Sequence, residues 1–248
     1  MIYLKNTQQL LVMKKASRIV ARCFEVLEKH IKPGTTLYEL DKIAYDYILS
    51  QNATPSFLGY KGFPASINAS LNEEVVHGIP DGRKLLSGDI ISIDIGAFFS
   101  GYHGDAARTY GVGEISSEDK RLIDVTRQSF FEGIKYAKKG NRLNQICKTI
   151  GLYIEDNGFS VVEEFVGHGI GREIHEMPNI PNLDLGKKGP KLDKGMTFAI
   201  EPMVNKGGPE CFIIEDGWTA ITIDGENSAH YENTIAITDG EPEILSII

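Results

Sequence analysis

The second half of this chain repeats the pattern of the first half at a nearly constant offset. An apolar stripe at helical spacing over residues 37–48 is matched 106 positions later by a stripe over residues 143–154. Residues 88–94 resemble residues 195–201, at an offset of 107, in residue type and order. Self-similarity of this kind predicts two packed copies of one helix-helix-strand-strand unit related by a pseudo-twofold axis, and therefore an α+β protein.

Apolar periodicity and capping residues locate the elements of each unit. A period of about 3.6 residues predicts a first helix from an N-cap at Thr7 to a stop at residues 32–34, Lys-Pro-Gly. Thr36, with Glu39 three residues later, forms a capping-box pattern for a second helix. The remaining elements are a third helix over about residues 117–137, a fourth carrying Leu143 to Ile154, and strands over residues 90–95 and 106–110.

Four carboxylates lie in apolar segments, and they coincide in pairs between the two halves. At the offset of 107, Asp94 falls on Glu201; at an offset of 127, which includes an insertion of 20 residues in the second half, Asp105 falls on Glu232. An ionised carboxylate in apolar surroundings is strongly destabilising unless a cation neutralises it. Arg108 can serve one of the four acids but not all of them. This deficit of basic partners predicts bound divalent metal ions.

Charge balance predicts two such ions. The four carboxylates carry four negative charges, and a neutral His168, which lies in a glycine-rich turn, adds none. Five ligands suffice for two ions only if some carboxylates bridge them, and bridged ions lie about 3.5–4 Å apart, as in two-metal hydrolases. Oxygen-rich ligands with one imidazole suit Mn²⁺, Co²⁺, Fe²⁺ or Zn²⁺.

Asp94 and Asp105 flank a hairpin pattern at residues 98–101, Phe-Phe-Ser-Gly. A symmetric loop centred between residues 99 and 100 would place the two acids directly opposite each other. Their Cβ atoms would then lie about 4.5–5.5 Å apart, and the carboxylates would repel each other unless a cation lay between them. The alternative is a pair of solvated hairpin acids, which the isoleucines on both sides of Asp94 disfavour.

Three histidines lie in loop sequences that favour a functional site. His168 stands in a turn whose glycines allow close backbone approach, His175 follows seven residues later, and His77 lies in a similar loop. A lone histidine is more often a satisfied core or surface residue than a ligand, but these three accompany four acids in apolar segments. The other histidines are His30, expected at a helix end or on the surface, and His103 and His230, which stay unassigned.

Composition excludes several classes of protein. The net charge of −8 argues against a nucleic-acid partner. The three cysteines are far apart, so neither a disulfide framework nor a thiolate zinc site is expected. The N-terminus lacks the pattern of a signal peptide, and no apolar run approaches the roughly 18 residues that span a bilayer. We therefore expect a cytoplasmic protein without a membrane partner.

Seven short motifs give the chain a family resemblance that covers nearly its whole length. They are EVVHGIP around His77, IDIG around Asp94, GYHGD ending at Asp105, GHGIG around His168, HEMP from His175, IEPM around Glu201 and YENT around Glu232. The series resembles that of type I methionine aminopeptidases. The chain has neither the long insertion of type II relatives nor the N-terminal zinc-binding extension of the eukaryotic type I form, so it is similar to the short bacterial form.

The resemblance implies the pita-bread fold, a pseudo-symmetric curved antiparallel sheet backed by helices. The expected organisation is a single catalytic domain over residues 1–248, built from halves at about 1–115 and 116–248. In that family the positions matching Asp94, Asp105, His168, Glu201 and Glu232 bind two metal ions. Those matching His77 and His175 contact the substrate and assist the chemistry, and Glu201 is the candidate for moving a proton.

The implied activity is removal of an N-terminal initiator methionine by two-metal-assisted hydrolysis of the first peptide bond, with a small second residue favoured. The expected substrates are peptides and nascent chains that begin with methionine, the ribosome is a candidate partner, and a monomer is expected. Phe57, Tyr60, Phe63 and Trp218 are the candidates for an apolar pocket around the thioether. Two positions depart from many members, Phe57 where several carry cysteine and Ile174 where several carry phenylalanine.

Two alternatives stay open. One is an Xaa-Pro aminopeptidase or dipeptidase of the same fold, although such relatives usually carry a further N-terminal domain. The other is a non-catalytic peptide-binding relative, which would have lost metal ligands that this chain retains.

Overall fold

The computed structural model describes residues 1–248 as an α+β protein. The helices are α1 (Thr7–Leu27), α2 (Leu37–Ser50), α3 (Ser117–Ile134), α4 (Leu143–Asp156) and a short 3₁₀ helix (Tyr60–Gly62). The strands of the first half are β1 (Thr54–Pro55), β2 (Ile67–Leu71), β3 (Glu74–Val76), β4 (Ile90–Phe99) and β5 (Tyr102–Gly111). Those of the second half are β6 (Ser160–Val161), β7 (Gly167–Gly169), β8 (Glu176–Ile180), β9 (Thr197–Ile200), β10 (Met203–Asn205), β11 (Cys211–Ile213), β12 (Ala220–Thr222), β13 (Ser228–His230), β14 (Asn233–Ala236) and β15 (Glu243–Ile244).

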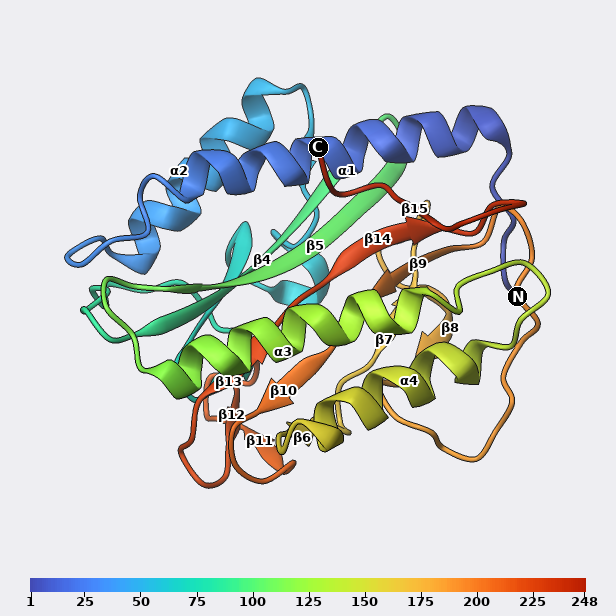
Figure 1. The fold of residues 1–248 in the computed structure, drawn as a ribbon. Helices are drawn as coiled ribbons and strands as arrows, with labels where there is room; N and C mark the ends of the chain where they lie inside the picture. The colour runs from blue at the N-terminus through green and yellow to red at the C-terminus, as the bar shows by residue number, and fades with distance from the viewer.

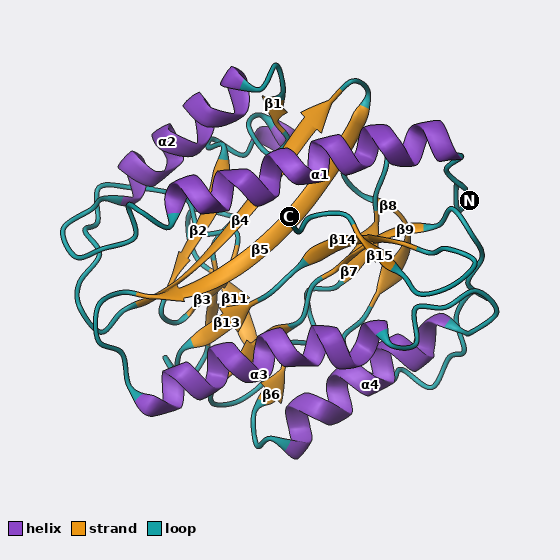
Figure 2. Ribbon diagram, turned by 45° about the horizontal axis from the view of Figure 1, so that its top comes forward, coloured by secondary structure: helices purple, strands orange, loops and turns teal.

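The helices lie together on one side of the strands. In Figure 1, α1 and α3 cross in front of the sheet, with α2 beside α1 and α4 beside α3. The turned view of Figure 2 shows the same two pairs, α1 with α2 and α3 with α4, framing the long strands β4 and β5 between them. This arrangement leaves the opposite side of the strands free of helices.

Every strand pairing is antiparallel, and two sheets dominate. In the first sheet β4 pairs with β1, β2 and β5. The second sheet has the order β15-β14-β9-β7-β8. Smaller sheets, β13-β10-β6 and β11-β12-β3, complete the strand layer.

Each half has its own apolar core. One buried cluster is built entirely from residues 19–112, where α1 and α2 pack on β4 and β5. The other is built from residues 122–237, with only Ile90 added from the first half. Since burial of apolar area is the main stabilising term, each half supplies most of its own stabilisation.

The sequence repeat is present in the structure as a repeat of elements. Helices α2 and α4 each have 14 residues and begin 106 positions apart. Two isolated bridges, Thr36 to Lys84 and Arg142 to Lys191, repeat at the same offsets. The turn glycines before β4 and β9, Gly88 and Gly195, both have positive φ, at +104° and +86°. The repeat seen in the sequence is therefore also a repeat of helices, bridges and turns.

The two halves join where β5 lies beside β14. The backbones of Ala107 and Glu232 exchange two hydrogen bonds, with N···O distances of 3.4 and 2.9 Å. Asp105 and Thr234 form the next contact, because the Thr234 hydroxyl accepts from the Asp105 N–H and donates to its carbonyl, at 3.0 and 2.8 Å. Two of the four acids thus lie directly on the junction between the halves.

The predicted helix ends need small corrections. The N-cap of α1 is Asn6 and not Thr7, because the Asn6 side chain accepts from the Gln9 N–H and the Gln9 side chain completes a capping box. Helix α1 ends at Leu27, several residues before the Lys-Pro-Gly stop. Helix α3 ends at Ile134 and not at residue 137. The capping box of Thr36 and Glu39 is confirmed.

The predicted register of the hairpin is wrong. The turn is centred one residue later, with Ser100 and Gly101 both at positive φ, 49° and 88°, which is typical of a type I′ turn. Asp94 therefore faces Ala107, and Asp105 faces Gly96. The two acids are diagonal neighbours on one face of the sheet, a position from which their side chains still converge.

Candidate metal centre and substrate cavity

A cavity of about 290 Å³ opens beside the junction of the two halves. It is lined by every site residue expected from the sequence: Phe57, Tyr60, Phe63, His77, Asp94, Asp105, His168, His175, Glu201, Trp218 and Glu232. Asp94, Asp105 and His168 lie on strands, Tyr60 lies in the 3₁₀ helix, and the other residues lie in the segments between elements, so only the folded chain brings them together.

Neighbouring strands present the five candidate ligands from both halves. Asp94 is on β4, Asp105 on β5 and His168 on β7, while Glu201 directly follows β9 and Glu232 directly precedes β14. Ligand atoms of Asp105, His168 and Glu232 lie within 4.8 Å of one another. The His168 Nε2 atom lies 3.4 Å from Glu201 Oε1 and 3.9 Å from Asp105 Oδ2. These separations suit donors that share a cation.

The acids are in an environment that disfavours their charged forms. Burial, followed by the neighbouring charge of Glu201, raises the pKa of Asp94 to about 6. Burial is also the first cause that raises the pKa values of Asp105, Glu201 and Glu232 well above their usual range. For Asp105 and Glu232 the other carboxylates add to this effect. The protein by itself therefore provides too little positive charge for four ionised acids.

Several buried polar atoms of the cluster have no hydrogen-bond partner. They are Asp94 Oδ1, Asp105 Oδ1, Glu232 Oε1 and His230 Nε2. Buried polar atoms in folded proteins are almost always hydrogen-bonded, so unpartnered atoms that converge on one cavity indicate a missing ligand. Oxygen donors together with one imidazole fit a divalent metal ion.

His168 is prepared to act as a neutral ligand. Its Nδ1 atom lies 2.9 Å from the Gly169 carbonyl oxygen, which can only accept, so Nδ1 carries the proton and Nε2 has a free lone pair. Burial lowers the pKa of His168 to about 3. Its contacts with Asp105 and Glu201 are therefore not ion pairs at neutral pH.

Arg108 does not serve any of the four carboxylates. Its guanidinium group donates to the backbone carbonyls of Ala107 and Glu232 and to the Asn233 side chain. It also lies over the Tyr231 ring, 4.4 Å from the ring centroid. Arg108 thus forms no ion pair with the acids, and its charge only partly offsets the rise in the pKa of Glu232.

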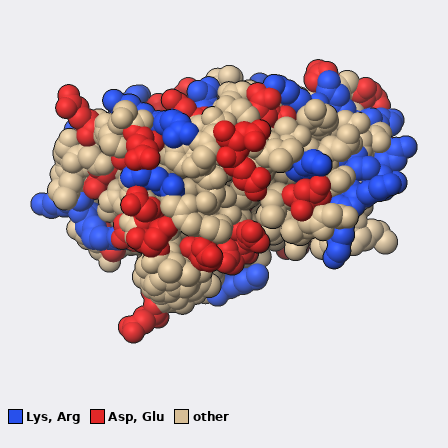
Figure 3. All heavy atoms as spheres, turned by 60° about the horizontal axis from the view of Figure 1, so that its bottom comes forward, with Lys and Arg blue, Asp and Glu red and all other residues tan.

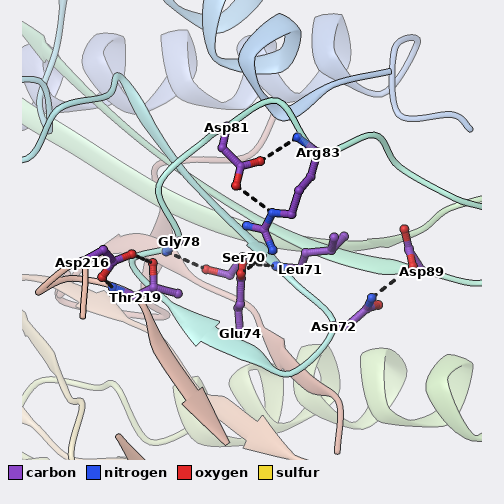
Figure 4. Close-up of polar contacts among 10 residues, drawn as sticks. All are labelled: Ser70, Leu71, Asn72, Glu74, Gly78, Asp81, Arg83, Asp89, Asp216 and Thr219. Carbon is purple, nitrogen blue, oxygen red and sulfur yellow. Dashed lines mark hydrogen bonds and ion pairs between the residues drawn. The ribbon is translucent and has the colours of Figure 1, made fainter. Parts of the chain in front are cut away.

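A constrained loop presents His77. The residue has a positive φ of 61°, which is uncommon for a side chain with a Cβ atom. Figure 4 shows the contacts around this loop: the Glu74 carboxylate accepts from the Leu71 N–H at 2.8 Å and pairs with Arg83 at 2.6 Å, and the Gly78 N–H donates to the Ser70 hydroxyl. Burial lowers the pKa of His77 to about 4, so its imidazole is neutral at neutral pH.

His175 lies across the cavity from this loop. Its Nδ1 atom is 2.9 Å from the Tyr60 hydroxyl, and its ring is stacked on the Tyr60 ring with centroids 5.2 Å apart. The rings of His175 and His168 are 4.2 Å apart. Burial lowers the pKa of His175 to about 4. This places a neutral imidazole directly beside the candidate metal ligands.

The candidate pocket aromatics form a continuous apolar wall. Phe57, Phe63 and Ile174 are buried together, and Trp218 packs edge-on against Phe63 with centroids 5.2 Å apart. The two unusual positions, Phe57 and Ile174, are therefore neighbours: Phe57 lines the cavity and Ile174 supports the wall. Asp216 fixes the turn that carries Trp218 by accepting from the Trp218 and Thr219 N–H groups. Figure 4 shows Asp216 beside Thr219.

Asn68 and His230 lie beside the acids in the cavity, and neither was assigned from the sequence. Asn68 donates from Nδ2 to Asp94 Oδ2 at 2.8 Å and is its cross-strand partner on β2. His230 Nε2 lies 3.6 Å from Glu201 Oε2. His230 precedes Glu232 by two residues. In an extended chain this spacing places both side chains on the same face, so the sequence could have indicated that His230 lies near Glu232. Asn68, a polar residue inside the apolar run of β2, gave a similar sign.

The remaining histidines lie outside the cavity. His30 is exposed just after α1, as expected. The His103 Nδ1 atom is 2.9 Å from the Ser56 hydroxyl, and its ring contacts Phe98. Lys61, Val76, Glu164, Phe165, Val166 and Met203 complete the cavity lining.

Comparisons with known proteins agree with this site. A profile of Metallopeptidase family M24 matches residues 12–239. The chain is 51% identical to a methionine aminopeptidase of Clostridium perfringens over 248 residues, covering 100% of both chains. It is 52% identical to methionine aminopeptidase 1 of Bacillus subtilis over 246 residues, covering 99% of both. The crystal structure of a methionine aminopeptidase from Thermotoga maritima superposes with a TM-score of 0.98 at 43% identity, covering 100% of both chains.

The fold and the site thus define a metal-dependent hydrolase with the pita-bread fold, as the motifs indicated. More specifically, the chain belongs to metallopeptidase family M24. Membership of this family implies the use of divalent metal, and the donor set described above fits such an ion.

The helices and the surface charges of the molecule have two further features. No helix is both long enough and apolar enough to cross a lipid bilayer. On the face shown in Figure 3, acidic and basic side chains are interspersed, with basic groups gathered towards one end and acidic groups across the middle.

The raised pKa values predict that metal binding releases protons. In the metal-free protein Asp94, with a pKa of about 6, retains part of its proton near pH 6, and burial favours the protonated forms of the other acids. A bound metal requires the acids to be ionised, so apparent affinity should fall as the pH is lowered from 8 to 6. The histidines, with pKa values of about 3 to 4, should not contribute over this range. Calorimetric titration with Mn²⁺ in buffers of different ionisation enthalpy would count the protons.

The expected result is net release that is larger at pH 6.5 than at pH 8. The variant Asp94→Asn should release fewer protons, because it removes one of the groups that must ionise. Affinity independent of pH, with no proton release, would contradict this account of the site.

Proposed function

We propose that this chain removes the N-terminal initiator methionine from proteins and peptides by metal-assisted hydrolysis of the first peptide bond. The observation that carries the proposal is the convergence of five candidate ligands, two neutral histidines and an aromatic wall on one cavity. The relatives at about half identity over the full length are named methionine aminopeptidases, which supports this activity over cleavage before proline.

We assign Asp94, Asp105, His168, Glu201 and Glu232 as the residues that would hold two divalent ions. Four carboxylates and one imidazole balance two such ions in charge, and their unpartnered atoms face one cavity. The chemistry that divalent ions supply at a site of this kind is polarisation of a carbonyl group and a lowered pKa for water. Mn²⁺, Co²⁺, Fe²⁺ and Zn²⁺ are the candidate ions.

The protein's own residues would orient the peptide and move the proton. Glu201 Oε1 faces His168 and Glu201 Oε2 faces His230, so one oxygen can hold a ligand position while the other takes a proton from the attacking water. His175 uses Nδ1 towards Tyr60, which leaves Nε2 to hydrogen-bond the developing oxyanion. His77, neutral and held in a constrained loop, would bind the scissile amide group.

The aromatic wall would accept the methionine side chain. Phe57, Tyr60, Phe63 and Trp218 line the cavity next to the acids. Contacts between a thioether and an aromatic ring contribute about 0.3–1.5 kcal/mol each. Because Phe57 is large, we expect a shallow pocket that fits an unbranched side chain closely.

We also propose that residues 1–248 form one catalytic domain whose halves divide at about residues 115 and 116. The separate apolar cores of the halves and the placement of candidate ligands in both support this division. We propose that the chain acts as a monomer in the cytoplasm and that peptides and nascent chains on ribosomes are its substrates.

The proposed function can be tested by reconstituting the protein with metal and assaying it on a panel of peptides. The purified chain is treated with chelator, reloaded with each candidate ion and assayed on Met-Ala-Ser, Ala-Ala-Ser, Ala-Pro-Gly and Met-Xaa-Ser peptides that vary the second residue. We expect metal-dependent release of free methionine, with kcat/KM for Met-Ala-Ser about 10–200-fold above that for Ala-Ala-Ser, the usual range for a side chain in an apolar pocket. Faster cleavage of Ala-Pro-Gly would favour the Xaa-Pro alternative, and no cleavage with any ion would favour a binding protein.

A further inference from the structure

The turn that carries His175 is closed by a carboxylate from the next residue. Glu176 Oε1 accepts from the Arg172 N–H at 2.8 Å and from the Glu173 N–H at 3.4 Å. The Gly171 N–H donates to the Glu173 carbonyl at 3.1 Å, and the Gly171 carbonyl accepts from the His103 N–H at 2.8 Å. The Glu176 side chain therefore lies inside the turn and fixes the backbone on which His175 stands.

A lysine from the start of the chain neutralises this carboxylate. Lys5 Nζ lies 2.5 Å from Glu176 Oε2, and the two side chains are only 5% and 6% exposed. Lys5 is anchored before α1, because its N–H donates to the Gly195 carbonyl at 2.7 Å and its Nζ atom lies 3.3 Å from the Tyr3 carbonyl oxygen. The pair joins segments that are 171 residues apart in sequence.

Two glycines, Gly171 and Gly195, allow the backbone to approach this ion pair and its anchor closely. A Cβ atom placed on Gly171 would lie 2.4 Å from Glu176 Oε1 and 2.5 Å from Lys5 Cε. A Cβ atom on Gly195 would lie 2.5 Å from the Lys5 carbonyl oxygen. An ion pair that is buried this completely loses much more when one partner is removed than an exposed pair does, because the remaining charge is left without a partner.

We propose that Lys5 is a positioning residue for His175: through its buried ion pair with Glu176 it holds the turn of residues 171–176 in the geometry that presents the imidazole to the cavity. The proposal rests on the role proposed above for His175. Lys5 does not line the cavity, so the segment before α1 would support the active site from outside it. The His77 loop is held by a comparable pair, Glu74 with Arg83, but from a nearby part of the chain.

The first test is a kinetic double-mutant cycle between Lys5 and His175. In Lys5→Met we expect kcat for Met-Ala-Ser to fall about 10–100-fold, the usual cost of losing a residue that orients a functional group, with KM little changed. In the His175→Ala background the same change at Lys5 should have little further effect on kcat, because its target is already absent. An equal loss in both backgrounds would overturn the proposal, since Lys5 would then act on something other than His175.

A second test does not depend on activity. Hydrogen exchange of the Arg172 and Glu173 amides should be at least about tenfold faster in Lys5→Met than in the unaltered chain, while exchange in β4 and β9 stays the same. Unchanged exchange in the turn would overturn the proposal, even if activity had fallen. If His175→Ala alone retained full activity, the proposed role of His175 would fail separately, and the exchange rates would still report whether Lys5 orders the turn.

The chain offers a matched control and a rescue. Lys14→Met removes another lysine–glutamate pair of the N-terminal region, Lys14 with Glu243. The two side chains are 33% and 41% exposed, so this variant should leave kcat and hydrogen exchange unchanged.

The double variant Lys5→Met with Glu176→Gln removes both charges and keeps an amide oxygen as acceptor for the turn. It should fold more stably than Lys5→Met and recover part of the protection of the Arg172 amide, and failure to recover any protection would contradict the role assigned to the ion pair.

Discussion

Replacing Asp105 by asparagine is expected to lower kcat/KM for Met-Ala-Ser by more than about 1,000-fold. The Asp105 carboxylate lies on the junction between the halves and shares its cluster with His168 and Glu232. An amide of the same shape is a weaker ligand for a cation and cannot balance its charge. The remaining acids would then bind metal more weakly.

This loss should occur without unfolding. Burial and the neighbouring carboxylates raise the pKa of Asp105 well above its usual range, so a negative charge at this position does not stabilise the metal-free fold. We therefore expect Asp105→Asn to match the metal-free unaltered chain in thermal stability at pH 7.5, and elemental analysis should show less bound metal. His168→Ala should give the same loss of metal-dependent cleavage.

A buried acid outside the cavity provides the control. Asp119 is 6% exposed, accepts hydrogen bonds from Ser116 and Asn227, and does not line the cavity. Asp119→Asn should change stability but not turnover per folded molecule. Normal metal content and turnover in Asp105→Asn would show that the ligand assignment is wrong.

Replacing His175 by alanine is expected to lower kcat about 100–1,000-fold, the usual cost of removing one donor to a developing oxyanion. The imidazole is neutral and held by Tyr60, so its free nitrogen can meet charge that appears only in the transition state. Because the ground-state carbonyl needs this donor less, KM should change little. Steady-state kinetics on Met-Ala-Ser would separate the two constants.

Two further variants make this test specific. His175→Gln keeps a side-chain N–H donor and should recover part of kcat. His103→Ala removes another partly buried histidine, which bonds Ser56 and does not line the cavity, and should leave kcat unchanged. A tenfold or larger rise in KM for His175→Ala, with kcat unchanged, would instead assign His175 to ground-state binding of the peptide.

The sequence predicted the main elements of the fold because its local patterns were strong. The capping box at Thr36 and Glu39 and the stripe from Leu143 to Ile154 correspond to α2 and α4. The hairpin register was predicted wrongly because its loop was centred by symmetry between the two acids, whereas the positive-φ residues Ser100 and Gly101 determine the turn.

The sequence indicated the candidate site residues through acids and histidines in unusual surroundings, and the structure brings them into one cavity. The sequence could not show what Arg108 contacts. Its acceptors are the backbone carbonyls of Ala107 and Glu232, and every residue has such a group. The contact between Lys5 and Glu176 was equally hidden, since no local pattern links residues 171 positions apart. Long-range contacts of this kind follow from tertiary packing rather than from periodicity.

The junction between β5 and β14 also determines when a newly synthesised chain can become catalytically active. Glu232 and its neighbours on β14 come from the last part of the sequence, and they hydrogen-bond to Ala107 and Asp105 from the first half. A chain still being synthesised could fold the core around α1 and α2 early, but it would hold only Asp94 and Asp105 of the five donors. Catalysis must therefore await the arrival of the C-terminal strands, and measured turnover reports molecules in which both halves have completed folding.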